Sequence, residues 1–533
     1  MGRCNWAKRA YLVFLLCAAA AIALPAQTFT TLYSFCSQSG CTDGANPFAG
    51  LIQAMDGNLY GTTAYGEPNN FCTYGCGTIF RVTPTGTLTT LYNFCSQYGC
   101  TDGAVPHAGL IQATDGNFYG TTFEGGANGT GTVFVMPPGG GTVTTMHSFY
   151  GPDGSFPSAG LVQATDGNFY GTTGGGGVND EGTVFRITPS GTLTMLYSFC
   201  SQSGCTDGAG PSGLVQATDG NFYGTTDGGG ANNSCGGSGC GTVFKITPTG
   251  TLTTLYSFCS QSGCTDGENP GAGLVQATDG NFYGTTGGDE GTVFKITPSG
   301  TLTTLYNFCP QSGCTDGAGP SGLVQATDGN FYGTTDGGGA GNSGTVFKIT
   351  PSGTLTTLYS FCSQSGCTDG DEPYAALVQA SNGIFYGTTE GGGNFFGPCP
   401  GGCGTVFSLD AGLGPAVSLS PASLTFGPQG VQAPNVPQVV TLTNTGEMPL
   451  SITGIAVTGL NSGDFAQANN CPISPNTLAP GDSCMITVYF FPVGSGTLAA
   501  AVTITDNALG SPQNVPLSGV GVSGKPGLAG PRR

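Results

Sequence analysis

The sequence predicts an all-β protein: a seven-bladed β-propeller of four-stranded antiparallel blades, closed by its N-terminal strand and followed by an Ig-like β-sandwich. Three observations lead to this fold class. One unit repeats seven times, each unit contains four strand-like runs, and the strand missing after the seventh unit stands in front of the first. A fixed period of this size is typical of stacked supersecondary units.

The repeat reads GLVQATDGNFYGTT, a glycine-rich stretch, GTVFKITPSGTLTTLYSF and then CSQSGCTDG. We name its four expected strands a (GLVQA), b (NFYGTT), c (GTVFKIT) and d (TLTTLYSF). Asp-Gly joins a to b, and Pro-Ser-Gly or Pro-Thr-Gly joins c to d, which are turn sequences that suit antiparallel hairpins. The phenylalanine that ends the GT[VI]F motif marks the seven units at Phe80, Phe134, Phe185, Phe244, Phe294, Phe347 and Phe407.

The two ends of the array predict a closed ring. The seventh unit has no strand d after its strand c near Phe407, and an extra strand d, TFTTLYSF, occupies residues 28–35. If these two segments pair, the ring leaves no sheet edge exposed. A linear solenoid would instead need polar capping units at both ends, and the sequence shows none.

Five segments are expected along the chain. Beyond residue 416, short alternating strands separated by turn signals predict the Ig-like sandwich, at residues 421–426, 439–443, 452–455, 485–490 and 502–504. The expected boundaries are 1–26 for a signal peptide, 27–410 for the propeller, 411–415 for a linker, 416–522 for the Ig-like sandwich and 523–533 for a flexible tail.

Residues 1–26 have the pattern of a secretory signal, because Arg3, Lys8 and Arg9 precede an apolar run from Tyr11 to Leu24. No later apolar run is long enough to cross a bilayer. We therefore expect a secreted, periplasmic or cell-surface protein that does not insert directly into a membrane.

The few charges of the chain are mostly acidic. Charged residues make up 8% of the sequence, against roughly 25% in ordinary globular domains. Thirty Asp and Glu oppose 11 Lys and Arg, which gives a net charge of −19. Such a surface repels nucleic-acid phosphates and anionic lipids, so both are excluded as expected partners.

Twenty of the 22 cysteines fall into ten close pairs after the expected signal peptide. An even number of locally paired cysteines in an exported chain predicts disulfides. Metal ligation is the rival interpretation, which export and the presence of only two histidines disfavour. The pairs are Cys36/Cys41, Cys72/Cys76, Cys95/Cys100, Cys200/Cys205, Cys235/Cys240, Cys259/Cys264, Cys309/Cys314, Cys362/Cys367, Cys399/Cys403 and Cys471/Cys484.

The motif GLVQATDGNFYGTT…GTVFKITPSGTLTTLYSF resembles the GloVer tandem repeat of the choice-of-anchor proteins, over residues 28–410. Residues 416–522 resemble the abnormal-spindle/Hydin-type Ig-like module, also called choice-of-anchor D. These resemblances imply secretion or surface display. They imply no established activity and no functional residues that could be transferred to this chain.

Variation among the seven units points to one face of the propeller. The a–b and c–d turns barely change, whereas the b–c loops vary in length and six d–a loops carry a cysteine pair. In a four-stranded antiparallel blade the b–c and d–a loops emerge on the same face. Recognition usually resides in loops held by a rigid scaffold, although repeats also drift wherever loops tolerate insertion.

Two residue types recur once per unit in positions that suit a ligand. The aspartates that follow strand d could form an acidic rim for Ca²⁺ or a cationic ligand, or could cap their own turns; they are Asp43, Asp102, Asp153, Asp207, Asp266, Asp316 and Asp369. The glutamines of strand a could line the channel and contact a sugar, or could form a structural hydrogen-bond girdle; they are Gln53, Gln112, Gln163, Gln216, Gln276, Gln325 and Gln379. We favour the structural interpretation of both sets, and expect no resident cofactor.

The sequence favours a non-catalytic binding or adhesion protein that recognises an extracellular glycan or another surface protein. No Ser/His/Asp or Cys/His arrangement stands out. A carbohydrate-active lyase or glycosidase is the enzymatic alternative, with the acidic doublet Asp289–Glu290 of a b–c loop as its candidate. A structural role in an envelope or matrix is the third possibility.

Overall fold

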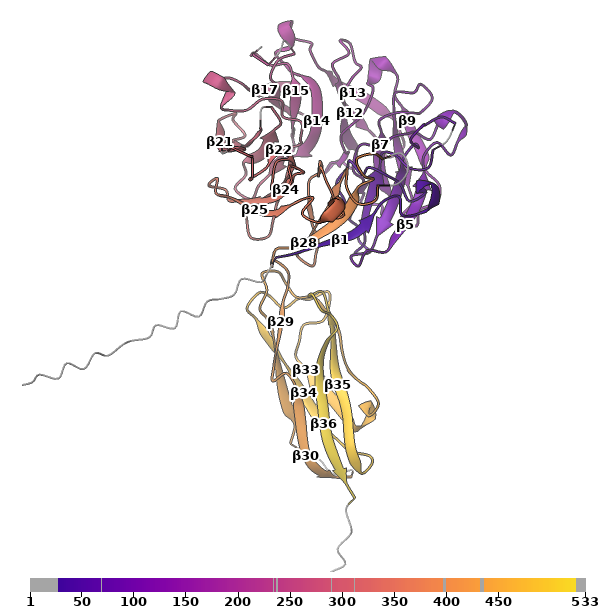
Figure 1. The fold of residues 1–533 in the computed structure, drawn as a ribbon, viewed down its shortest axis with the longest axis vertical. Helices are drawn as coiled ribbons and strands as arrows, with labels where there is room; N and C mark the ends of the chain where they lie inside the picture. The colour runs from indigo at the N-terminus through magenta and orange to yellow at the C-terminus, as the bar shows by residue number, and fades with distance from the viewer. Residues whose placement is uncertain are drawn as a thin grey trace, which may run out of the picture.

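The computed structural model describes residues 27–523, apart from residues 69, 233, 236, 237, 289, 311, 396–398 and 432–435. The expected signal peptide (residues 1–26), most of the expected tail and Asp289 of the acidic doublet lie outside the described residues. Within them the protein is all-β, with seven four-stranded sheets from the repeats and two from the C-terminal region (Figure 1).

The seven repeat sheets share one order, in which strands a, b, c and d follow one another as antiparallel neighbours. The first three sheets are β2 (Ile52–Gln53), β3 (Leu59–Thr63), β4 (Thr78–Val82), β5 (Leu88–Asn93); β6 (Ile111–Gln112), β7 (Phe118–Thr122), β8 (Thr132–Met136), β9 (Thr144–Ser148); and β10 (Val162–Gln163), β11 (Phe169–Thr173), β12 (Thr183–Ile187), β13 (Leu193–Ser198). The next three are β14 (Ala209–Gln216), β15 (Phe222–Gly228), β16 (Thr242–Ile246), β17 (Leu252–Ser257); β18 (Val275–Gln276), β19 (Phe282–Thr286), β20 (Thr292–Ile296), β21 (Leu302–Asn307); and β22 (Ala318–Gln325), β23 (Phe331–Gly337), β24 (Thr345–Ile349), β25 (Leu355–Ser360).

The N-terminal strand completes the seventh sheet. This sheet consists of β26 (Val378–Gln379), β27 (Phe385–Thr389), β28 (Thr405–Asp410) and β1 (Thr28–Ser34). β1 pairs antiparallel with β28, and Thr31 lies opposite Phe407. The pairing expected between residues 28–35 and strand c of the last unit is therefore present.

Aromatic contacts join each sheet to the next. The phenylalanine after strand d packs edge-on against the phenylalanine of strand c in the following sheet, with ring centroids 5.1–5.3 Å apart. Phe35 and Phe80 make the same contact between the seventh sheet and the first, at 5.1 Å. The other pairs are Phe94–Phe134, Phe149–Phe185, Phe199–Phe244, Phe258–Phe294, Phe308–Phe347 and Phe361–Phe407.

Strand a differs in length from the five residues that the sequence predicts. In five sheets it has only two residues, whereas β14 and β22 have eight. The segments that lead into and begin these two strands read DGAGPSGL, one residue shorter than DGANPFAGL of the first unit. The shorter connection stays straight enough to pair with strand b from Ala209 and Ala318 onward.

The C-terminal region contains two sheets around one core, which includes Val440, Ile486, Val502 and Val515. Three of its strands, β29, β33 and β36, were not expected from the sequence. The sheets are β29 (Val417–Ser420), β31 (Gln438–Asn444), β34 (Ser483–Phe490), β33 (Phe465–Asn469) and β30 (Leu424–Gly430), β36 (Gln513–Val522), β35 (Gly496–Asp506), β32 (Ile452–Thr458). β30 and β36 pair in parallel.

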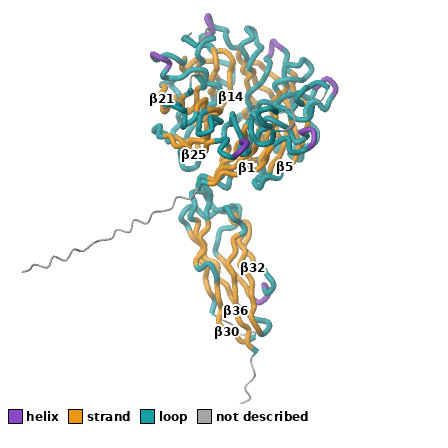
Figure 2. The backbone as a smooth tube through the Cα atoms, in the orientation of Figure 1, coloured by secondary structure: helices purple, strands orange, loops and turns teal. Residues whose placement is uncertain are grey.

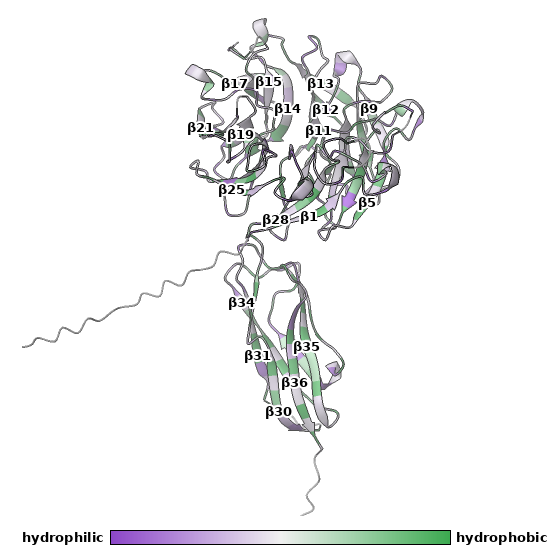
Figure 3. Ribbon diagram, viewed as in Figure 1, coloured by the Kyte–Doolittle hydropathy of each residue, from purple (hydrophilic) through white to green (hydrophobic). Residues whose placement is uncertain are grey.

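Helical structure is limited to single turns, which Figure 2 shows at the periphery of the strands. Six of these 3₁₀ turns lie in d–a loops and the seventh lies in the C-terminal region. They are η1 (Ser39–Cys41), η2 (Tyr98–Cys100), η3 (Gly151–Asp153), η4 (Ser203–Cys205), η5 (Ser262–Cys264), η6 (Ser365–Cys367) and η7 (Ser462–Asp464). Hydrophobic residues concentrate in the strands (Figure 3). In the part of the chain that the structure describes, no helix is long and apolar enough to cross a membrane.

Candidate functional site

Each repeat sheet has two ends that differ in composition. One end, which we call the turn face, carries the short a–b and c–d turns, such as residues 54–58 and 83–87. The other end, which we call the loop face, carries the longer b–c and d–a loops, such as residues 64–77 and 35–51. Antiparallel strand order places the two kinds of connection at opposite ends, so the variable segments share one face.

Disulfides crosslink the loops of the loop face. All ten expected cysteine pairs are bonded, with six in d–a loops, three in b–c loops and Cys471–Cys484 in the C-terminal region. Some of these sulfurs lie within 4.8 Å of another disulfide or of a glutamate oxygen. Sulfurs that are bonded to each other provide no thiolate for a metal ion, so these groups serve as crosslinks.

The aspartates that follow strand d anchor their own loops. Asp43 is fully buried, and its Oδ2 accepts hydrogen bonds from the Tyr33 hydroxyl at 2.8 Å and from Ser37 N and Oγ at 2.9 Å. Hydrogen bonds from the same loop also hold Asp102, Asp153, Asp207, Asp266, Asp316 and Asp369. These hydrogen bonds are the kind that the structural interpretation of the seven residues predicts, in which each aspartate caps its own turn.

The glutamines of strand a link neighbouring units. Each Oε1 accepts a hydrogen bond of 2.8–3.0 Å from a backbone N–H in the a–b turn of the preceding unit. Gln53 of the first unit accepts its bond from Ser381 of the seventh. The other acceptors are Gln112, Gln163, Gln216, Gln276, Gln325 and Gln379. The amide oxygens are thus used in a hydrogen-bond girdle between units.

The turn face is held by repeated polar contacts. The Tyr223 hydroxyl donates to Asp219 at 3.0 Å, and Lys245 Nζ lies 2.8 Å from the same carboxylate. Burial alone would raise the pKa of Asp219, but hydrogen bonds from Lys245, Asn221 and Tyr223 hold it below its ordinary value. The same arrangement recurs as Asp279/Tyr283/Lys295 and Asp328/Tyr332/Lys348.

On the loop face, the residue before the proline of each d–a loop has a left-handed backbone. We call these seven residues the rim positions; their φ lies between 50° and 63°, and they are Asn46, Val105, Phe156, Gly210, Asn269, Gly319 and Glu372. This conformation costs a residue other than glycine about 1 kcal/mol. Five units nevertheless keep a side chain there, so the backbone is constant while the side chain ranges from glycine to phenylalanine.

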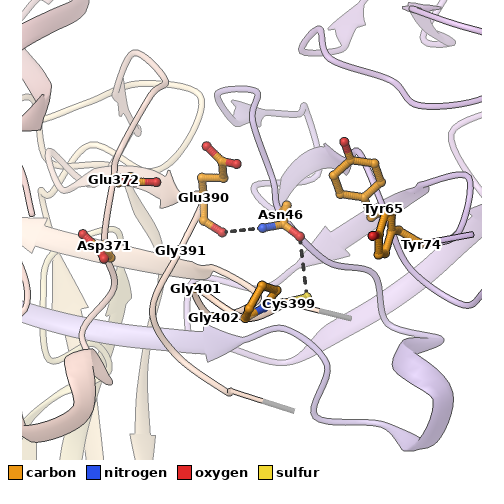
Figure 4. A pocket seen from close by; sticks show the side chains of 11 residues that line it. Asn46, Tyr65, Tyr74, Asp371, Glu372, Glu390, Gly391, Cys399, Gly401 and Gly402 are labelled. Carbon is orange, nitrogen blue, oxygen red and sulfur yellow. Dashed lines mark hydrogen bonds between the residues drawn. The ribbon is translucent and has the colours of Figure 1, made fainter. Parts of the chain in front are cut away.

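A cavity of about 390 Å³ lies on the loop face where the seventh unit meets the first. Tyr65 and Tyr74 of the first b–c loop line one side (Figure 4). Asp371 and Glu372 of the seventh d–a loop line the other side, with Glu390 between the two groups (Figure 4). All five side chains belong to segments that vary among the units.

Backbone hydrogen bonds connect the segments that carry the acidic wall of this cavity, by which we mean Asp371, Glu372 and Glu390. Glu390 N donates to the Glu372 carbonyl at 2.9 Å, and Asp371 and Gly391 exchange two bonds of 2.9 and 3.1 Å. On the first unit's side, Asn46 Nδ2 donates to the Glu390 carbonyl at 3.0 Å. The three acidic residues therefore lie on two adjacent, hydrogen-bonded segments.

Two carboxyl groups of this wall have raised pKa values. Burial raises the pKa of Glu390 to about 7, and the charges of Glu372 and Asp371 add to the rise. Burial, together with the charge of Asp371, also raises the pKa of Glu372. In the sixth unit, burial and the charge of Glu372 raise the pKa of Asp336 to about 6. Such a group can gain a cationic partner or hold a proton near neutral pH.

The sequence analysis did not select Asp371, Glu372 or Glu390, because it sought residues that recur in all seven units. Only the seventh unit has acidic residues at all three of these positions, so the combination departs from the repeat. An alignment of the units carries part of this signal, because the residue directly after GTT varies. It is Glu390 in the seventh unit, aspartate in the fourth and sixth (Asp227 and Asp336), and Ala64, Phe123, Gly174 or Gly287 in the others.

Taken together, the contacts describe an all-β protein built from tandem repeats. The family model for the Gloeobacter/Verrucomicrobia repeat matches residues 72–290 and 234–423. The chain therefore belongs to the Gloeobacter/Verrucomicrobia repeat family, as the resemblance of its repeat to GloVer implied. No curated protein matches the chain.

Solved structures show only weak likeness. A luciferin-regenerating enzyme is 12% identical, with a TM-score of 0.36 over 55% of this chain and 87% of its own. A protein assigned as an oxidoreductase (glucose dehydrogenase) from Thermus thermophilus is 17% identical, with a TM-score of 0.36 over 72% and 100% of the two chains. The ASH/PapD-like domain 7 of human CEP192 is 20% identical, with a TM-score of 0.15 over 20% and 87%. TM-scores this low carry no argument about fold or activity.

Proposed function

We propose that the protein is an exported seven-bladed β-propeller, closed by β1 and followed by an Ig-like β-sandwich, that binds an extracellular glycan on its loop face without catalysing a reaction. The closed arrangement is supported by contacts that join the seventh unit to the first in the same way as all other neighbours. These are the Phe35–Phe80 ring contact and the hydrogen bond from Ser381 N to Gln53 Oε1.

Export is supported by the disulfides and by the signal-like pattern of residues 1–26. Nine disulfides crosslink the repeats, and such bonds persist in oxidising compartments. Secreted, periplasmic and surface-attached proteins all reside in such an oxidising compartment.

The cavity between the seventh and first units is the observation that carries the binding proposal. Its volume of about 390 Å³ lies in the range of small-ligand sites. Two tyrosines line it, and tyrosine combines an apolar ring face with a hydroxyl group. Sugars present apolar C–H faces and hydroxyls together, so this lining suits a glycan better than a purely apolar ligand.

A glycan-array screen of the oxidised full chain, followed by calorimetry with a hit, tests the proposal. We expect Tyr74→Ala to weaken binding about tenfold, because the ring face of the cavity is lost. Tyr98→Ala is the matched control, since Tyr98 is 93% exposed and does not line the cavity. Binding to another surface protein with no glycan hit, or equal affinity of the Tyr74→Ala variant, would contradict glycan recognition at this site.

A carbohydrate-active enzyme is the second candidate, which the raised pKa of Glu390 favours. A carboxylic acid that keeps its proton near pH 7 can act as a general acid, and Asp371 and Glu372 supply further carboxylates in the same cavity. Mass spectrometry of the incubated hits separates the two functions. Intact glycans support binding alone, and cleaved glycans whose release is lost in Glu390→Gln would establish the enzyme.

A further inference from the structure

The charges of the described chain are separated between the two ends of the repeat sheets. All Lys and Arg residues among the described residues occupy one position, the fourth of the TVFK run in strand c, and they are Arg81, Arg186, Lys245, Lys295 and Lys348. Strand c runs from the loop face to the turn face, so this position lies toward the turns. The loop face therefore has acidic side chains without a described lysine or arginine to neutralise them.

Carboxyl groups are concentrated at the cavity between the seventh and first units. Asp371, Glu372 and Glu390 all line it, and no ion pair involving them is present among the described residues. Their backbone hydrogen bonds hold them close together, so they cannot move apart to relieve repulsion. A positively charged group in the cavity would offset this repulsion, whereas an anionic ligand would increase it.

The rim position of the seventh unit places a carboxylate side chain on a left-handed backbone. Glu372 has φ 54°, a value at which the fourth and sixth units carry Gly210 and Gly319. Glycine would remove the backbone strain at this position.

The wall opposite the carboxylates is aromatic. Tyr65 and Tyr74 face the cavity from the first unit (Figure 4), and their ring centroids are 6.1 Å apart. Aromatic faces attract cations as well as the apolar faces of sugars. A ligand that combines an ammonium group with a sugar ring would satisfy both walls at once.

We propose that this cavity binds the protonated amine of an amino sugar, with Glu372 and Glu390 contacting the ammonium group and Tyr65 and Tyr74 contacting the ring. The proposal rests on the proposed glycan-binding function and specifies its ligand class. N-acetylated sugars lack the charge and leave the carboxylates unpaired. Uronic acids are repelled by the same side chains.

Calorimetry of the oxidised full chain with a glucosamine hexamer and an N-acetylglucosamine hexamer tests the charge requirement. We expect the glucosamine hexamer to bind and the acetylated hexamer to bind at least about tenfold more weakly, in low-salt buffer near pH 7, where amines keep much of their charge and Glu390, with a pKa of about 7, can ionise against a cationic ligand. Added salt should weaken the first interaction. Equal affinity for both hexamers would overturn the amine proposal and leave glycan binding intact. Binding of neither hexamer would also overturn the amine proposal, and the glycan array would then decide whether the glycan-binding function stands.

Site variants test the assignment of residues. Glu390→Gln and Glu372→Gln should each weaken glucosamine binding about tenfold, while Glu181→Gln, which removes the same charge elsewhere on the loop face, should leave it unchanged. Glu372→Gly should weaken binding without lowering the melting temperature, since glycine suits this backbone. Unchanged binding by Glu372→Gly would overturn the role of the rim position.

A hexalysine peptide separates an amino sugar from a basic polypeptide. Both carry ammonium groups, but the peptide lacks the sugar faces that would contact the tyrosines. We expect hexalysine to bind more weakly than the glucosamine hexamer, and Tyr74→Ala to affect only the sugar. Tighter binding of hexalysine would overturn the amino-sugar assignment in favour of a basic protein partner.

Discussion

The turn face and the loop face of the repeat sheets are built from the same strands, yet their polar chemistry is opposite. On the turn face, Asp328 is paired with Lys348 and Tyr332, and the same group recurs in two other units. On the loop face, Asp336 stands at the other end of β23 and has a neighbouring glutamate in place of a cation. Residues that recur around the array hold it together, whereas residues that depart from the repeat provide its candidate site.

The largest expected effect tests whether recurrence means structural importance. Phe35→Ala should lower the free energy of unfolding by about 4 kcal/mol, because it removes a fully buried ring from the contact between the seventh and first sheets. Phe258→Ala removes the equivalent ring between the fourth and fifth sheets and should cost a similar amount. Urea unfolding followed by intrinsic fluorescence measures both.

Phe156→Ala is the matched change on the loop face. Phe156 is 38% exposed and occupies a rim position, so its loss should alter stability by no more than about 0.5 kcal/mol. If Phe35→Ala were as mild as Phe156→Ala while Phe258→Ala remained severe, the seventh sheet would not be joined to the first as the structure describes.

An intermediate effect is expected on the turn face. Asp328→Asn should cost about 1 kcal/mol near neutral pH, because Lys348 and Tyr332 lose their charged partner. Burial opposes ionisation of Asp328, but hydrogen bonds from Lys348, Asn330 and Tyr332 lower its pKa below 3.8. Its stabilising contribution is therefore present above the unfolded pKa and is lost as the pH falls through the folded pKa. Wild type and variant should converge in melting temperature under strongly acidic conditions, and a constant difference would contradict this origin.

The smallest effect is expected on the loop face, where the dependence of stability on pH has the opposite sign. The folded pKa of Asp336 is about 6, above the ordinary 3.8, so its contribution to stability is present below the unfolded pKa and is lost as the pH rises through the folded pKa. Asp336→Asn should therefore flatten the decline in melting temperature between about pH 4 and 6. Asp328→Asn serves as the control in the same unit, and an identical pH response of the two variants would refute the contrast between the faces.

The array could be predicted from the sequence because its signals are local and repeated. Asp-Gly turns, together with Pro-Ser-Gly or Pro-Thr-Gly turns, set the strand phasing in nearly every unit, and residues 28–35 match strand d letter for letter in TTLYSF. The C-terminal region was harder, since β36 contains Pro516, Gly519 and Gly521 and pairs in parallel with the distant β30. Proline and glycine weaken the local strand pattern, so only tertiary pairing reveals this strand.

The candidate site was less predictable for a related reason. The sequence identified the face on which the cavity lies, but repetition drew attention to Asp43 and Gln53, whose oxygens are engaged inside the protein. Glu372 and Glu390 are 18 positions apart in the sequence, and their proximity depends on the backbone bond between them. That bond follows from how a d–a loop crosses the end of strand b, which composition alone does not indicate.

The pairing of β1 with β28 also determines when the molecule can finish folding. Thr28, at the start of the described chain, lies opposite Asp410, at the end of the last repeat. Ribosomes make β1 first and its partner hundreds of residues later, and contacts so distant in sequence form slowly. A nascent or truncated chain consequently keeps β1 unpaired until every repeat has been synthesised. Completion of the seventh sheet thus requires the last repeat, and a chain that ends before residue 405 would lack the partner strand of β1.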